Sequence, residues 1–129
     1  MKKLISLLLL LLPFTESAFA DEYLVCSGVT TLFYGTPLTE ERLSSSVSMR
    51  FTGKYVEMSD VGLVGVNKSA GITWVWTKTI GDEYWLYNFD TVSGRLVKNV
   101  LEDKTASNGS RRAFRQDTYQ CRPAERLID

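Results

Sequence analysis

The side chains with the clearest chemical potential in this chain are carboxylates, because the sequence contains no histidine. That absence excludes the usual catalytic triads, histidine-based zinc sites and imidazole acid–base chemistry. Two carboxylates that flank a glycosidic bond can hydrolyse it, so a carboxylate-based glycan hydrolase is kept as a remote alternative. The candidates for such a pair are Glu57, Asp60, Asp82, Glu83 and Asp90.

No motif for binding phosphate, calcium or a dinucleotide accompanies these carboxylates. Asp82 and Glu83 stand at what we interpret as a hairpin tip, where charged side chains are ordinarily solvated. We therefore predict that the protein is not an enzyme and that it has no catalytic residue, no metal ligand and no cofactor.

The two cysteines, Cys26 and Cys121, lie near the two ends of the chain. No C-x-x-C motif is present, and without histidine a metal site has no support. An even pair of cysteines in a small exported domain most often forms a bridge. We predict a structural disulfide between Cys26 and Cys121.

Export itself is predicted from the first twenty residues. Lys2 and Lys3 precede an apolar run, and the small residues Ala18 and Ala20 form a cleavage site, so residues 1–20 read as a signal peptide cleaved after Ala20. The apolar run is too short to span a bilayer, and no later run is long enough. We expect a soluble periplasmic or secreted protein whose single β domain covers residues 21–129.

The charge of that domain limits its partners. The chain has 15 basic and 15 acidic residues, and without Lys2, Lys3 and Glu16 the net charge becomes −1. A near-neutral surface argues against nucleic acid or an anionic membrane as the main partner. We expect an unknown protein or an envelope glycan instead, and no membrane span; the sequence leaves the oligomeric state open.

Residues 74–89 read WVWTKTIGDEYWLYNF and carry six aromatic side chains. Gly81-Asp82 is typical of a two-residue hairpin turn, which places Ile80 opposite Glu83 and fixes the register of the whole ribbon. One face then collects five of the six aromatic residues, all but Tyr84, because side chains alternate along a strand. The pairs on that face are Trp85 with Lys78, Tyr87 with Trp76, and Phe89 with Trp74.

We interpret this aromatic face as core, because a domain of this size must bury its largest apolar surface. A partly open cleft at the Trp85 end is the alternative. Lys78 opposite Trp85 suits either interpretation, as a cation–π pair at the rim of the sheet.

The remaining chain alternates short strand-like runs with turn signals, which predicts an all-β fold. We expect a single small antiparallel β-barrel or sandwich closed by one disulfide. Strands are expected at residues 22–27, 61–66 and 114–121, with a hairpin over 47–58. Residues 36–41 are either one helical turn or a loop, and residues 102–112 are expected to form a long exposed loop.

The segment after the aromatic hairpin is predicted to be a structural turn. Asp90 can accept backbone N–H groups, Ser93 lies inside the turn, and Gly94 can take the left-handed conformation that ends it.

Three short motifs together resemble a group of small exported bacterial β proteins with an F-[DN]-x-x-S-G-x-[LF] hairpin and a late cysteine. They are Tyr23-x-x-Cys26, Phe89-Asp90-x-x-Ser93-Gly94-x-Leu96 and Tyr119-x-Cys121. The resemblance spans most of the mature chain, and it implies a fold rather than an activity.

A second resemblance is to the periplasmic inhibitors of C-type lysozyme, which carry S-G-x-x-Y and W-[ST]-K-G-[DE] motifs. Residues 69–74 (SAGITW) and 76–82 (WTKTIGD) are similar, with an extra Ala70 and a Thr79-Ile80 insertion. This resemblance implies that Ser69 and Lys78 would enter or flank the acidic cleft of a lysozyme.

We therefore predict a non-enzymatic exported binding protein, with a lysozyme inhibitor as the alternative. The candidate partner-binding residues are Ser69, Gly71, Lys78 and Trp85.

Overall fold

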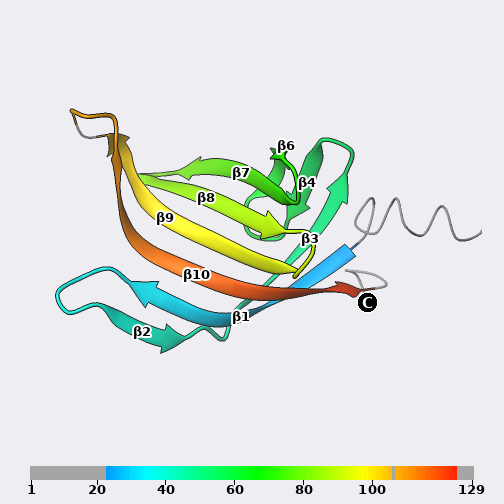
Figure 1. The fold of residues 1–129 in the computed structure, drawn as a ribbon, viewed down its shortest axis with the longest axis horizontal. Helices are drawn as coiled ribbons and strands as arrows, with labels where there is room; N and C mark the ends of the chain where they lie inside the picture. The colour runs from blue at the N-terminus through cyan, green and yellow to red at the C-terminus, as the bar shows by residue number, and fades with distance from the viewer. Residues whose placement is uncertain (1–22, 106, 125–129) are drawn as a thin grey trace, which may run out of the picture.

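A computed structural model describes residues 23–105 and 107–124, and the predicted signal peptide lies outside these ranges. The described residues form ten strands of one sheet and no helix (Figure 1). Accordingly, no described helix is long and apolar enough to cross a membrane. The strands are β1 (Tyr23–Phe33), β2 (Thr39–Arg42), β3 (Ser46–Thr52), β4 (Tyr55–Met58), β5 (Gly62–Gly65), β6 (Asn67–Ala70), β7 (Thr73–Ile80), β8 (Glu83–Asp90), β9 (Arg95–Thr105) and β10 (Arg111–Ala124).

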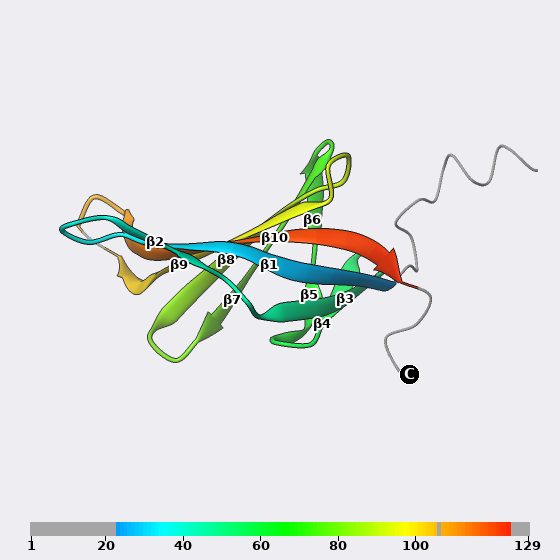
Figure 2. The same ribbon diagram turned by 90° about the horizontal axis from the view of Figure 1, so that it is seen from below.

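The sheet is antiparallel and nearly closed into a barrel, which confirms the predicted fold class. Its strand order is β5-β4-β3-β1-β10-β9-β8-β7-β6, and β2 pairs with β1 outside this path. The first and last long strands, β1 and β10, are therefore neighbours near the middle of the sheet. Figure 2 shows them side by side along the length of the molecule.

Strand β1 changes its partner halfway along. Its first half, Tyr23–Ser27, pairs with β3, and its second half, from Thr30 to Phe33, pairs with β2. The change falls at Gly28, whose N–H donates to the Ser45 carbonyl at 2.8 Å. A Cβ atom at Gly28 would lie 2.6 Å from the Leu43 carbonyl oxygen, so only glycine lets the chain between β2 and β3 cross here.

The core fills the nine-stranded end of the barrel. Strand β3 reaches across it, since the Phe51 ring lies 4.8 Å from that of Trp74, 5.7 Å from that of Trp76 and 5.4 Å from that of Phe89. Trp76, Tyr87 and Phe89 are buried, and Trp74 and Trp85 pack partly against them. Most of the predicted aromatic face is therefore core.

The predicted register of the aromatic hairpin is also confirmed. Ile80 pairs with Glu83, and the three expected cross-strand pairs follow in order. A two-residue turn sets this register locally, so no distant contact is needed to specify it.

Two expectations about the connections were wrong. The helical turn proposed for residues 36–41 is absent: Thr39–Arg42 forms β2, which supplies the backbone partner that the second half of β1 needs. The long loop expected at 102–112 is short, because β9 continues to Thr105 and β10 begins at Arg111. These strand ends are polar since they extend beyond the core, and an Arg112–Glu102 ion pair of 2.6 Å links them.

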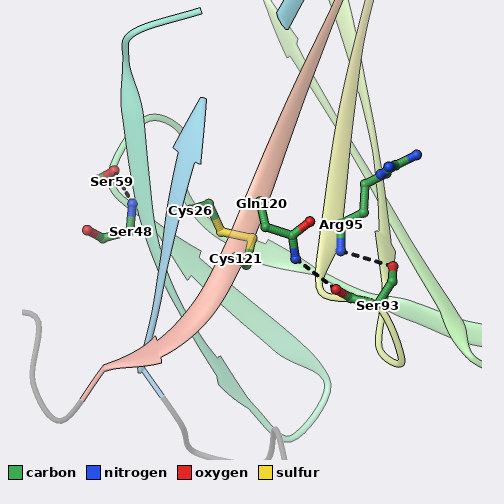
Figure 3. Close-up of a disulfide and its surroundings, with 7 residues drawn as sticks. All are labelled: Cys26, Ser48, Ser59, Ser93, Arg95, Gln120 and Cys121. Carbon is green, nitrogen blue, oxygen red and sulfur yellow. Dashed lines mark hydrogen bonds between the residues drawn. A yellow bond between two sulfur atoms is a disulfide. The ribbon is translucent and has the colours of Figure 1, made fainter. Parts of the chain in front are cut away.

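The Cys26–Cys121 disulfide is present as predicted and joins β1 to β10 across 95 residues (Figure 3). Both cysteines are buried, and no described cysteine is free. A disulfide is compatible with an oxidising, exported compartment.

The turn between β8 and β9 packs beside this bridge. The Asp90 carboxylate accepts the N–H groups of Val92 at 2.8 Å and Ser93 at 3.1 Å, and these bonds lower the pKa of Asp90. Gly94 has a φ of +75°, and its carbonyl accepts the N–H of Cys121 at 2.8 Å. Figure 3 shows the Gln120 amide reaching the Ser93 carbonyl from β10. The motif thus anchors the turn to the strand that carries Cys121.

Candidate functional site

The barrel is open at the end away from β3, β4 and β5. Beyond Gly28 the sheet keeps β2, β1, β10, β9, β8 and β7, so β2 and the far half of β7 are its edges there. β6 pairs with β7 only at Val75 and Thr73, and Thr77 to Ile80 lie exposed. Figures 1 and 2 show the β1–β2 hairpin and the β7–β8 hairpin well apart at this end.

The inward side of this six-stranded part is called the open face below. Cross-strand register arranges its side chains in two rows. The outer row contains Lys78, Trp85, Val100, Arg115, Phe33 and Thr39. The inner row, one step closer to the core, contains Trp76, Tyr87, Lys98, Asp117, Thr31 and Glu41.

The outer row is accessible. Lys78 and Thr39 are exposed, Phe33 is 37% exposed, and Trp85 and Arg115 are half-buried. Only Val100 is fully buried among these six residues. The row therefore presents two aromatic rings and two cations on strands whose positions are fixed by the sheet.

The inner row holds charges inside the barrel. Lys98, Asp117 and Thr31 are 5%, 4% and 6% exposed. The Thr31 hydroxyl donates to Asp117 Oδ1 at 2.9 Å, and Arg115 Nε lies 3.3 Å from the same oxygen. Buried polar groups of this kind are usually kept only when they are paired.

Lys98 is the exception to that pairing. Its ammonium lies 3.3 Å from the centre of the Trp85 ring, a cation–π contact, and it has no hydrogen bond or ion pair with a described residue. Burial lowers the pKa of Lys98, and the nearby Arg115 adds to that effect, whereas Asp60, Asp117 and Glu83 oppose it.

Two further carboxylates hold the aromatic residues of this region. The Tyr87 hydroxyl donates to Asp60 Oδ2 at 2.7 Å, and the Trp85 indole donates to Glu83 Oε1 at 2.8 Å. Burial raises the pKa of Tyr87 far above its ordinary value, and the bond to Asp60 contributes next.

Of the five candidate carboxylates, Asp60, Glu83 and Asp90 each accept hydrogen bonds that fix neighbouring side chains or backbone. The described residues include no group of three or more His, Cys, Asp or Glu side chains arranged to hold a metal ion.

The predicted binding residues separate into two places. Lys78 and Trp85 are direct neighbours in the outer row of the open face. The cation over the Trp85 ring is Lys98, however, and not Lys78 as expected. Ser69 and Gly71 lie at the other end of β7, since Ala70 pairs with Thr73. Lys78 lies five positions beyond Thr73 along the strand, or roughly 16 Å at about 3.3 Å per residue.

Ser69 lines a surface groove of about 740 Å³ together with Lys54, Tyr55, Gly65, Val66, Asn67 and Lys68. Three of its polar side chains are engaged in hydrogen bonds within the chain. Asn67 Oδ1 accepts both the N–H and the hydroxyl of Ser69, and the Lys68 ammonium donates to the Gly53 carbonyl at 2.8 Å. The lysozyme-inhibitor alternative would need this groove and Lys78 to reach one cleft from opposite ends of β7.

Sequence reasoning missed Lys98, Arg115, Asp117 and Thr31. A signal for the first was present, because Leu96, Lys98 and Val100 alternate along one strand and place a lysine between two core positions. Asp117 similarly shares a face with Tyr119 and Cys121. What the sequence does not reveal is that β9 and β10 bring these charges together.

No protein-family model, curated protein or solved structure matches this chain.

Proposed function

We propose that the protein is a non-enzymatic exported binding protein that holds an envelope glycan against its open face. The observation that supports this proposal most directly is the outer row, in which the accessible rings of Phe33 and Trp85 flank Arg115. Aromatic surface combined with a few fixed polar groups is typical of a ligand site. The support is rigid, because each side chain stands on a paired strand.

The proposal can be tested by sedimenting the exported form with insoluble peptidoglycan and with other envelope polysaccharides. We expect the wild-type protein to sediment with at least one of them. Phe33→Ser should reduce the bound fraction several-fold, because it removes an exposed ring without opening the buried core. Tyr55→Ser is the matched control, since Tyr55 is 51% exposed but lies in the other groove.

Three outcomes would overturn the proposal. Failure of every glycan to sediment the protein would remove the ligand class. Loss of binding in Tyr55→Ser but not in Phe33→Ser would move the site to the groove around Ser69. Release of soluble sugar that Glu83→Gln abolishes would show an enzyme.

A further inference from the structure

The strongest unexplained feature of the open face is the charge in its inner row, which is called the floor below. Lys98 stands between Leu96 and Val100 on β9, which are both fully buried, and Lys98 itself is only 5% exposed. An ammonium has three donors, yet this one lies over the Trp85 ring and makes no hydrogen bond or ion pair with a described residue. Placing a charged side chain between two core residues costs free energy, so the position calls for an explanation.

A second cation nearby is also incompletely paired. Arg115 Nε is buried and makes no hydrogen bond, although its 3.3 Å distance from Asp117 Oδ1 is short enough for an ion pair. Asp117 Oδ1 already accepts the Thr31 hydroxyl. Asp117 is therefore engaged by Thr31 and Arg115, whereas the Lys98 ammonium makes no ion pair with a carboxylate of the described residues.

The two cations are close enough to act together. Lys98 is opposite Asp117 and Val100 is opposite Arg115, so Lys98 and Arg115 are diagonal neighbours on one face. Diagonal neighbours in an antiparallel pair lie roughly 7–8 Å apart, within reach of long side chains. The other charged groups that act on Lys98 are Asp60 and Glu83, which already accept from Tyr87 and Trp85.

We propose that Lys98 and Arg115 form an anion-binding site in the floor of the open face, and that this site takes a carboxylate of the bound ligand. A guanidinium fork matches the planar geometry of a carboxylate, and an ammonium adds a point charge beside it. The flanking rings of Trp85 and Phe33 suit an organic acid better than an inorganic ion. This inference rests on the proposed function and narrows its ligand to an acidic glycan.

The probes for this site are glucuronate, a sugar that carries a carboxylate, and glucose, a neutral sugar of the same ring size. The Trp85 indole N–H reports binding in a ¹H–¹⁵N NMR titration, because it lies in the same cluster as Lys98. At constant ionic strength we expect glucuronate to shift this signal with saturation in the millimolar range, whereas glucose should leave it in place. Inorganic phosphate is a third arm, and it should bind more weakly than glucuronate.

Two substitutions assign the site. Lys98→Met keeps the length of the side chain but removes the charge, and it should weaken glucuronate binding at least tenfold. Lys54→Met is the matched control, because Lys54 is an exposed lysine in the groove around Ser69 rather than in the open face, and the change there should be less than threefold. Arg115→Gln gives a second test that does not depend on the folding of the Lys98 variant.

Equal shifts with glucuronate and glucose, or unchanged affinity in both Lys98→Met and Arg115→Gln, would overturn the anion site. Tighter binding of phosphate than of glucuronate would overturn the organic carboxylate. The proposed function fails separately: if polymeric glycan sediments equally with wild type and Lys98→Met, the binding function stands and the anion site falls. If glucuronate binds but no polymeric glycan sediments with the protein, the anion site stands and the proposed binding of an envelope glycan falls.

Discussion

At the scale of single residues, the inward side of this sheet combines a stable core with groups that reduce stability. Lys98 occupies a position where leucine or methionine would pack without a desolvation penalty. Proteins tend to keep such strained or costly groups at functional positions. The alternation of Leu96, Lys98 and Val100 is visible in the sequence, but the ring of Trp85 above the ammonium depends on the pairing of β8 with β9.

Tyr87 gives a test of the electrostatics in this region. Its pKa is raised by burial and by Asp60, and that of Tyr119 is raised by burial, so both are neutral in the folded protein. In the unfolded chain a tyrosine ionises near pH 10. The stabilisation from the neutral hydroxyl is therefore complete below about pH 10 and is lost as the pH rises further.

We expect Tyr87→Phe to be less stable than wild type at pH 8 by about 1–3 kcal/mol, because it loses a hydrogen bond to a carboxylate. Above pH 10 the wild type should lose up to about 1.4 kcal/mol per pH unit more than the variant. Urea unfolding at several values between pH 8 and 11.5 measures both effects. Lys98, whose pKa is lowered, gains stability over part of the same range, but it does so in both proteins. Parallel pH profiles would contradict the assignment.

At the scale of elements, the hairpins were predictable and the switch of partners was not. The Gly81-Asp82 turn sets the β7–β8 register from adjacent residues, so the sequence pattern alone predicts the aromatic face. Strand β1 pairs with β3, β2 and β10, and nothing local in residues 23–33 specifies where β3 gives way to β2. The polar run at 39–42 therefore resembled a loop or helical turn, although it completes an edge of the open face.

The switch depends on Gly28, and Gly28→Ala should destabilise the protein by about 1–3 kcal/mol because a methyl group would press on backbone atoms. The ideal Cβ position lies 2.6 Å from the Leu43 carbonyl oxygen and 2.7 Å from that of Ser45, and neither can rotate away. Gly65→Ala is the control, since no atom lies within 4 Å of its Cβ position in β5. Denaturant midpoints that shift equally in the two variants would show that the crossing at Gly28 tolerates a side chain.

At the scale of the whole molecule, the open face follows from the number of strands at each end. The sheet has β3, β4, β5 and β6 to close one end around Phe51 and lacks them at the other. A sequence predicts the strands and their inward positions, but closure depends on non-local pairing between β1 and β10, the first and last strands. The charge pattern and the absence of histidine exclude classes of function but do not locate the site. Lys98 and Arg115 come together through the pairing of β9 with β10, and Thr31 joins them through the pairing of β1 with β10.

The disulfide secures the same pairing, which leads to a prediction for the molecule as a whole. Cys26 and Cys121 face each other in the β1–β10 ladder at a sequence separation of 95. Closing a loop of that size removes unfolded-state entropy worth roughly 4–5 kcal/mol in the chain-entropy account. We expect the Cys26→Ala/Cys121→Ala protein to be less stable by about 2–5 kcal/mol in urea unfolding, because native strain and residual structure reduce the ideal value.

Alanine is the suitable replacement, since serine would bury hydroxyl groups at sites that are 0% and 8% exposed. The control is the wild-type protein unfolded in urea with a reductant present. Its free energy of unfolding should match that of the double variant, apart from the contribution of the packing contacts made by the two sulfur atoms. The β1–β10 ladder continues from Thr30 to Phe33 beyond the bridge, so the reduced protein should still fold and keep its open face. The test is to reduce the disulfide without urea and to measure glucuronate binding while the protein remains folded. Loss of binding under these conditions would instead show that the bridge positions Arg115 and Lys98.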